Sequence, residues 1–236
     1  GHPTNRKSFN GYVPFQQKVY SRLVFIILST WTHDATFNDI RQWATNRNVS
    51  FKILVGGCEL AKQSDDILCV NAQDGYEDLT QKIAEGLNFM YTYDSSWTHI
   101  MKIDDTDIDG YAKHGNFKLL EYELGMTPYP YFGRRVYFFN DCHGMNSTCR
   151  YYHMRHVNKS SPWFTKKYEG PFVSTAAGGG GYILKRTLVQ NLSKEIDRKA
   201  GPYEDVAVAI YAKKHRFKPR PFTLFEERGK TEVAYG

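Results

Sequence analysis

The sequence has few cysteines and no long hydrophobic segment. Its 236 residues include four cysteines, Cys58, Cys69, Cys142 and Cys149, too few for a domain held together mainly by disulfides. Cys58 and Cys69 lie in segments typical of a protein core and are predicted to be buried thiols, whereas Cys142 and Cys149 share a loop and are able to pair. The longest strongly apolar run is 23–28, and a membrane-spanning helix needs about 20 such residues. We therefore expect no membrane span within this chain.

The sequence also lacks internal repeats, low-complexity tracts and a Pro/Gly/Ser-rich linker, which argues against a repeat protein or an array of domains. Hydrophobic residues make up 41% and charged residues 24%, a composition typical of a folded globular chain. The length fits one sizeable core. We predict a single domain over 1–236, with an N-terminal extension at 1–20 and two halves at 22–110 and 111–236.

The net charge is +6, from 31 basic and 25 acidic residues. A basic protein suits an anionic partner, but the Lys and Arg residues are dispersed along the chain, which argues against a nucleic-acid partner. Aromatic residues reach 15%. Such an excess suits flat ligands with polar edges, including sugars and nucleosides, although most of these side chains are expected in the core.

The order of secondary-structure signals predicts an α/β fold. Strand signals at 22–28, 49–55, 67–70 and 98–103 alternate with helical patterns at 35–47 and 76–93. This alternation indicates a mostly parallel central sheet flanked by helices, with ligands at the carboxyl ends of its strands. The second half is less regular: a strand at 131–140, a long loop over 141–180, a strand at 182–184, a helix ending near 199, a helix from 202 and an irregular tail from 218.

Three carboxylates follow the strand at 98–103, on Asp104, Asp105 and Asp107. Carboxylates this close repel one another unless a hard cation such as Mg²⁺ or Mn²⁺ neutralises them. Asp105 and Asp107 are separated by one residue, so in an extended segment their side chains share a face. A solvated acidic turn is the alternative, but the position after a buried strand favours metal binding.

Two further segments are candidates for ligand binding or catalysis, and one cluster is a candidate zinc site. The run of glycines at 178–181 allows the backbone to approach a ligand closely. Glu204 and Asp205 begin a predicted helix, where the helix dipole is expected to lower the pKa of an acid. In the long loop, Cys142, His143, Cys149, His153 and His156 have spacings that match structural zinc sites poorly.

Taken in chain order, several segments resemble the characteristic blocks of one protein family. In the first half, residues 37–43 are similar to "A-I-R-x-T-W", residues 65–82 to "D-I-L…D-S-Y-x-N-L-T-x-K-T", and residues 102–107 to "K-x-D-D-D". In the second half, residues 129–130 and 179–184 resemble the segment that contains "G-x-G-Y-V-L-S", and residues 204–206 match "E-D-V". These are blocks of the β-1,3-glycosyltransferase superfamily, which includes galactosyltransferases and fringe proteins. The resemblance spans residues 22–210, nearly the whole chain.

The chain departs from these blocks at three places. Thr106 interrupts the acidic triplet, and Lys185 takes the place of the serine after "G-Y-V-L". Family members often carry a metal-binding histidine about two dozen residues after "E-D-V", whereas His215 lies only ten residues after Asp205. Either His215 replaces that ligand, or water and the donor diphosphate complete the coordination of the metal.

The resemblance implies a GT-A fold, which is a Rossmann-like domain that uses a nucleotide sugar, with residues 22–110 binding the nucleotide sugar and residues 111–236 binding the acceptor. It implies an inverting transferase that moves a sugar from a UDP-sugar donor to a glycan or glycoconjugate hydroxyl, forming a β-linkage. If a membrane anchor precedes the sequence, the implied location is the Golgi lumen, and otherwise the cytoplasm.

The resemblance also implies roles for individual residues. The metal, Mn²⁺ or Mg²⁺, would be held by Asp105 and Asp107, and Asp205 would be the catalytic base. The donor would be bound by Ser29, Thr30, Arg41, Asp74, Lys82, Asp104, Gly179, Gly180 and Gly181, and the acceptor by Trp163, Tyr182 and Glu204.

Two alternatives of other classes stay open on the sequence alone. The first is a module of the same fold that binds a sugar or a nucleotide without turnover. The second is a metal-dependent phosphodiesterase that uses the same acids, for which the dispersed basic residues offer little support.

Overall fold

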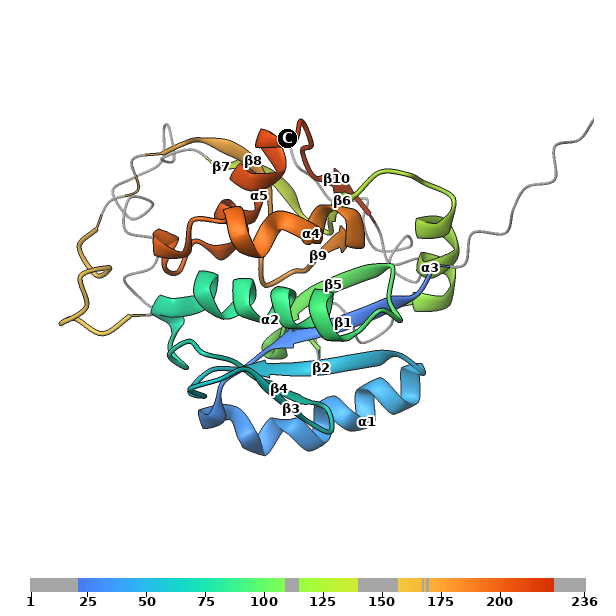
Figure 1. Cartoon of the computed structure of the whole chain (residues 1–236), viewed down its shortest axis with the longest axis horizontal. Helices are drawn as coiled ribbons and strands as arrows, with labels where there is room; N and C mark the ends of the chain where they lie inside the picture. Colours follow the sequence, from blue (N-terminus) through green and yellow to red (C-terminus); the bar gives the residue numbers. More distant parts are fainter. Residues whose placement is uncertain (1–20, 109–114, 140–156, 167, 169, 223–236) are drawn as a thin grey trace, which may run out of the picture.

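The computed structural model describes residues 21–108, 115–139, 157–166, 168 and 170–222. Within them, eight strands form one sheet: β1 (Leu23–Leu28), β2 (Ser50–Val55), β3 (Lys62–Ser64), β4 (Ile67–Cys69), β5 (His99–Asp104), β6 (Tyr131–Gly133), β9 (Tyr182–Lys185) and β10 (Arg220–Pro221). Their order across the sheet is β10-β6-β9-β5-β1-β2-β4-β3 (Figure 1). β1 pairs in parallel with β2 and β5, β2 with β4, and β6 with β10. β9 runs antiparallel to β5 and β6, and β3 runs antiparallel to β4.

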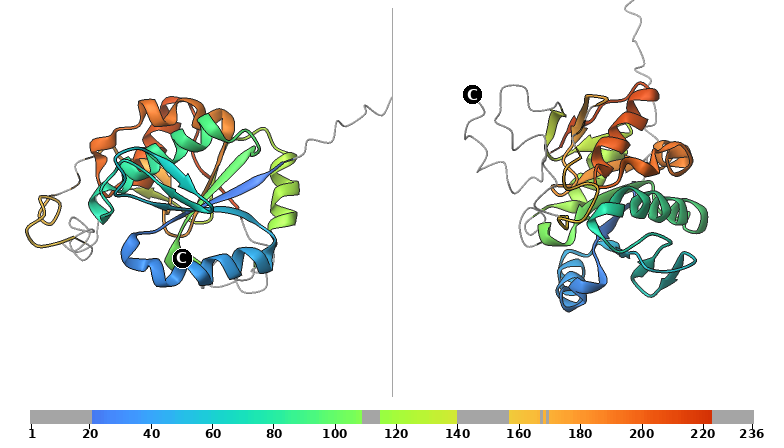
Figure 2. Two further views of the ribbon diagram at one scale, coloured as in Figure 1. Left: turned by 60° about the horizontal axis from the view of Figure 1, so that its bottom comes forward. Right: turned by 90° about the vertical axis from the view of Figure 1, so that its left-hand side faces the viewer.

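Helices cover both faces of this sheet. They are α1 (Phe37–Arg47), α2 (Leu79–Tyr93), α3 (Phe117–Gly125), α4 (Arg186–Glu195) and α5 (Glu204–Lys214). Buried residues of α2, α4 and α5 form one core with one face of the sheet, and buried residues of α1 and α3 form a second core with the other face. The left view of Figure 2 shows α1 on one side of the sheet, with α2 and α4 on the other.

β1 illustrates why the sheet is the middle layer. All of its residues are buried, and they alternate between the two cores. Val24, Ile26 and Leu28 belong to the core under α2, whereas Phe25 and Ile27 belong to the core under α1. Successive side chains of a strand point to opposite faces, so a continuous apolar run is the pattern of a strand covered on both sides.

The predicted fold class is confirmed, since the structure is an α/β sheet, mostly parallel and flanked by helices. The strands predicted in the first half and the helices at 35–47 and 76–93 are found, each helix beginning with a 3-10 segment, Trp31–Thr36 and Tyr76–Asp78. Both predicted halves contribute strands to the same sheet, through the pairing of β5 with β9.

Three expectations about the second half are wrong. The strand predicted at 131–140 is two strands, because the chain bends at Arg134 and Arg135 and β7 (Val136–Phe139) joins a separate sheet with β8 (Val173–Ala176). β8 itself lies in a stretch predicted to be a loop, and α3 was not predicted. The helix expected to end near 199 stops at Glu195 and is followed by a 3-10 turn, Arg198–Ala200.

The cysteine prediction also needs correction. Cys58 and Cys69 form a disulfide, with Cα atoms 5.8 Å apart. The parallel pairing of β2 with β4 brings them together, since Cys69 ends β4 and Cys58 follows the end of β2. Cys142, Cys149 and the histidines near them lie outside the described residues. None of the described helices is both long and apolar enough to cross a bilayer.

Candidate active site

The acidic turn after β5 is the centre of the site. β5 ends at Asp104, and Asp105–Asp107 form one turn of 3-10 helix. Side chains three residues apart eclipse one another in such a turn, so Asp104 and Asp107 lie on the same side. Both face Gly179, where an added Cβ would lie 3.0 Å from Asp107 Oδ2 and 3.4 Å from Asp104 Oδ2. The expectation that Asp105 and Asp107 share a face of an extended segment is therefore wrong.

Asp105 instead faces the segment that follows β1. Its Oδ2 accepts a hydrogen bond from the Ser29 hydroxyl at 2.6 Å and lies 2.7 Å from Nδ1 of His33. Its side chain is only 8% exposed. Thr30, next to Ser29, caps the 3-10 helix by accepting a bond from the backbone N–H of Thr32. The structure thus brings together two of the predicted donor residues, Ser29 and Thr30, beside the acidic turn.

Lys102 is buried beneath the acidic turn and links it to α5. Its Nζ donates to Asp104 Oδ1 at 2.7 Å, to Glu204 Oε1 at 2.7 Å and to the carbonyl oxygen of Gly178 at 3.0 Å. Burial alone would lower the pKa of Lys102, but the charges of Asp104 and Glu204 outweigh it and raise the pKa. The other carboxylate oxygen of Glu204 accepts a bond from the Tyr182 hydroxyl at 2.8 Å. Lys102 is therefore a fixed positive charge between the two acidic segments.

Asp205 lies in the first turn of α5. The backbone N–H of Gly178 donates to its Oδ2 at 3.1 Å, and the Tyr137 hydroxyl lies 3.4 Å from the same oxygen. The backbone N–H of Val206 donates to Oδ1. Burial, followed by the negative charge of Glu204, raises the pKa of Asp205 to about 7. The expected lowering of this pKa is therefore wrong, because burial and a neighbouring acid outweigh the backbone N–H groups and the charge of Lys102.

The pKa of Asp107 is also raised. Burial and then the charge of Asp104 bring it to about 6, while the positive charges of Lys102, Arg134 and Arg135 act in the opposite direction. The two arginines occupy the bend between β6 and β7. They were not among the predicted site residues, because their approach to Asp107 depends on that bend.

The glycine run passes between the two acidic segments. A Cβ on Gly178 would collide with the carboxylate of Glu204, and the φ of Gly181 is +94°, a conformation that residues with side chains rarely adopt. At Gly180, an added Cβ would lie 3.8 Å from Cδ of Arg135. The run therefore allows backbone groups to line the space between the acidic turn and the first turn of α5.

A family model described as Galactosyltransferase matches residues 57–222, which is well over half of the chain. The chain belongs to this family. The match includes the acidic turn, the glycine run, Glu204 and Asp205, and it confirms the resemblance drawn from the sequence. No individually curated protein matches the chain. The coarse activity follows from the family: the protein is a glycosyltransferase.

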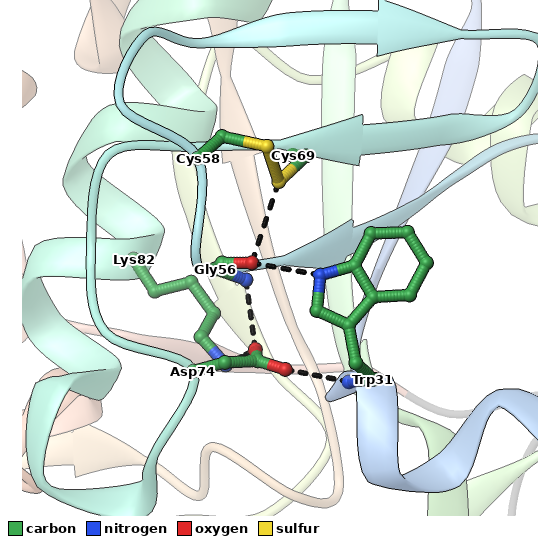
Figure 3. The surroundings of a disulfide bond; sticks show 6 residues. All are labelled: Trp31, Gly56, Cys58, Cys69, Asp74 and Lys82. Carbon is green, nitrogen blue, oxygen red and sulfur yellow. Dashed lines mark hydrogen bonds and ion pairs between the residues drawn. A yellow bond between two sulfur atoms is a disulfide. The ribbon is translucent and has the colours of Figure 1, made fainter.

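Lys82 and Asp74, both predicted to bind the donor of this glycosyltransferase, bond to each other in a hydrogen-bond network at the end of β1. Nζ of Lys82 donates to Asp74 Oδ1 at 2.7 Å and to the carbonyl oxygen of Ser29 at 3.0 Å, and the side chain is 1% exposed. Asp74 also accepts a bond from the backbone N–H of Gly56 at 2.7 Å (Figure 3). These contacts commit Lys82 to supporting the end of β1, where Ser29 lies, so we do not propose that it touches a phosphate.

Arg41 lies at the opposite end of the sheet from the acidic turn. Its guanidinium makes two hydrogen bonds to Asp66, at 2.7 and 2.9 Å. Asp66 precedes β4 and is therefore at the amino end of a strand parallel to β1 and β2. The hydrogen bond from Arg41 is the main cause of the lowered pKa of Asp66. This geometry argues against the predicted contact of Arg41 with the donor.

Of the predicted acceptor residues, Trp163 alone borders a cavity. The cavity, of about 270 Å³, is also lined by Tyr168 and Tyr203. The Trp163 ring meets Tyr203 edge to face at 6.0 Å between centroids, and Nζ of Lys166 lies 4.0 Å from the ring centroid. Tyr182 and Glu204 are 0% and 3% exposed, which argues against direct contact with an acceptor.

His215 does not reach the acidic turn. It follows α5 at the end opposite to Asp205, about 15 Å away for a helix of this length. Its Nε2 lies 3.2 Å from Glu195 Oε2. The structure therefore argues against His215 as a ligand of a metal at the acidic turn. Within the described residues, no cluster of three or more His, Cys, Asp or Glu side chains is arranged to hold a metal.

Proposed function

We propose that this glycosyltransferase has the GT-A fold and transfers a sugar, with inversion, from a UDP-sugar donor to a hydroxyl of a glycan or glycoconjugate, forming a β-linkage. The observation that carries the proposal is that one glycine run lies against both acidic segments, with Asp107 and Asp104 near Gly179 and Asp205 bonded to Gly178. A transferase of this kind needs a site for an anionic leaving group and a base for the acceptor hydroxyl. Here both lie against the same glycine run.

The carboxylates of the acidic turn fit a hard divalent cation. Asp104 and Asp107 present oxygens toward the same glycine, and Mg²⁺ is usually bound by one or two carboxylates together with substrate phosphates. We propose that Asp107 holds Mn²⁺ or Mg²⁺ with Asp104 as its partner, and that Asp105 orients the turn through Ser29 and His33. When bound, the cation would neutralise charge on the diphosphate.

The proposed base is Asp205. Its Oδ2 is held by Gly178 and Tyr137, so the carboxylate has one orientation. Its pKa of about 7 suits a general base, which works best when its pKa is near the working pH. Trp163, Tyr168 and Tyr203 line the neighbouring cavity, and we propose them as aromatic surfaces for the acceptor, since sugar C–H faces pack on aromatic rings.

The disulfide also bears on the location that we propose. Disulfides persist mainly in oxidising compartments, and Cys58 and Cys69 are joined. We therefore favour the secretory pathway, including the Golgi lumen, over the cytoplasm.

The proposal is tested by measuring UDP release from UDP-sugars in the presence of Mn²⁺, with calorimetry of UDP binding beside it. UDP release that depends on Mn²⁺ and on an added sugar acceptor supports the transferase. Binding of UDP without turnover on any donor would identify a binding module instead. Screening UDP-galactose, UDP-N-acetylglucosamine, UDP-glucose and UDP-xylose identifies the donor sugar.

A further inference from the structure

Trp31 is a large aromatic residue that lies exposed beside the acidic turn. It begins the 3-10 helix after β1, and 45% of its surface is exposed. Asp105 is contacted by Ser29 and His33, which lie two residues before and two residues after Trp31. Because a residue spans at most about 3.6 Å of chain, the Cα atom of Trp31 is within about 7 Å of both. The backbone that carries the indole is therefore close to the acidic turn.

The exposed indole is held in one orientation. Its Nε1–H donates to the carbonyl oxygen of Gly56 at 2.9 Å, and the backbone N–H of Trp31 donates to Asp74 Oδ2 at 2.5 Å (Figure 3). Asp74 is fixed in turn by Lys82 and by the backbone N–H of Gly56, each at 2.7 Å. These contacts therefore fix the orientation of a residue of which 45% remains exposed.

The loop that carries Gly56 is fixed as well. The disulfide ties Cys58 to Cys69, whose Sγ lies 3.3 Å from the carbonyl oxygen of Gly56 (Figure 3). Gly57 also lies against the indole, since an added Cβ would lie 3.9 Å from Cδ1 and Nε1. The carbonyl that orients the indole is thus attached to a loop closed by a covalent bond.

We propose that Trp31 binds the uracil base of the donor by stacking, while the diphosphate extends to the acidic turn; this inference rests on the function proposed above. Bases stack on aromatic side chains through their faces, and the anchoring of Trp31 through one edge and its backbone is compatible with an available face. A ring that is already oriented loses little conformational freedom when the ligand binds. Phe37, whose ring centroid is 6.1 Å from that of Trp31, supports it from inside the protein.

The test compares UDP with inorganic pyrophosphate, which lacks a base, by titration calorimetry in the presence of Mn²⁺. Trp31→Ala should weaken UDP binding by about 5- to 150-fold, the range expected for one stacked base, and should leave pyrophosphate binding unchanged. Trp31→Phe keeps a ring and should retain most of the UDP affinity. Tyr122→Ala is the matched control, because Tyr122 is 64% exposed on α3, and it should change neither affinity.

Intrinsic fluorescence gives a second readout that does not depend on the alanine variant. Trp43 and Trp97 are 8% and 1% exposed, and Trp163 lines the cavity proposed for the acceptor, so quenching by UDP that disappears in Trp31→Phe identifies Trp31 as the stacked residue. Unchanged UDP binding in Trp31→Ala, or an equal loss of UDP and pyrophosphate binding, would overturn the stacking role while the transferase proposal stands. A wild-type protein that binds neither ligand with Mn²⁺ would overturn both.

Discussion

Replacing Lys102 with methionine should destabilise the protein by about 3–5 kcal/mol, the range for removing one partner of a buried ion pair. Methionine is close to lysine in length, so the packing volume is largely kept, and what is lost is the charge. The side chain of Lys102 is 2% exposed and that of its partner Glu204 is 4% exposed. Without the ammonium group, Glu204 would be a buried carboxylate whose remaining side-chain partner is the hydroxyl of Tyr182.

The loss is large against the whole stability of a domain, which is about 5–15 kcal/mol. Urea unfolding of the wild type and the variant measures it directly, from the shift of the midpoint at constant slope. Lys118→Met is the matched control, since Lys118 is an exposed lysine on α3, and surface changes of this kind stay within about 0.5 kcal/mol.

A double variant separates the lost charge from lost packing. Adding Glu204→Gln to Lys102→Met removes the unpaired carboxylate, so the double variant should be more stable than Lys102→Met alone. A cost below about 1 kcal/mol for Lys102→Met, or a double variant no more stable than the single one, would refute the reasoning that Lys102 neutralises Glu204 in the folded protein.

Three other changes test the site. Asp205→Asn should keep UDP affinity and lower kcat by about 10²- to 10⁴-fold, measured at saturating donor. In the wild type, kcat/KM should rise with pH through about 7, because the base is active only when deprotonated and its pKa is about 7. An exposed aspartate would instead place this rise near pH 4. Asp107→Ala, or added EDTA, should weaken UDP binding markedly in calorimetry, and unchanged affinity in both cases would exclude the metal bridge. Replacing Cys58 and Cys69 together with serine should cost about 3 kcal/mol, because the disulfide closes a loop with a sequence separation of 11; a melting temperature equal to that of the wild type would contradict this.

The sequence predicts the parts of the fold that local patterns determine. The apolar run that forms β1 and the acids that follow β5 are visible as a buried strand and a strand-end cluster, and the glycine run marks a close backbone approach. It does not predict contacts that depend on distant pairing. Lys102 and Glu204 are 102 residues apart in the chain, and the disulfide depends on the register of β2 against β4.

Two errors have a common physical cause. The pKa of Asp205 was expected to be lowered by its helix position, and Asp105 was expected to face the same way as Asp107. Both expectations used the local backbone alone. In the structure, burial beside Glu204 decides the first, and the 3-10 turn decides the second. The sequence does not place His33, Trp31 or Arg135 near the acidic turn for a related reason. Each lies in or beside a turn that no short sequence pattern specifies.

Burial and neighbouring acids together raise the pKa of two carboxylates beside the glycine run. Four carboxylates lie beside the glycine run, on Asp104, Asp107, Glu204 and Asp205. The buried Lys102 contacts two of them, Asp104 and Glu204. Burial first, and then the charge of a neighbouring acid, raises the pKa of Asp107 to about 6 and that of Asp205 to about 7. In the function proposed above, the carboxylate of Asp107 suits a divalent cation, and the raised pKa of Asp205 suits a proton acceptor that works near neutrality. Because Lys102 contacts both acidic segments, it holds them in a fixed relation, and the proposed transfer depends on such fixed positions of its reacting groups.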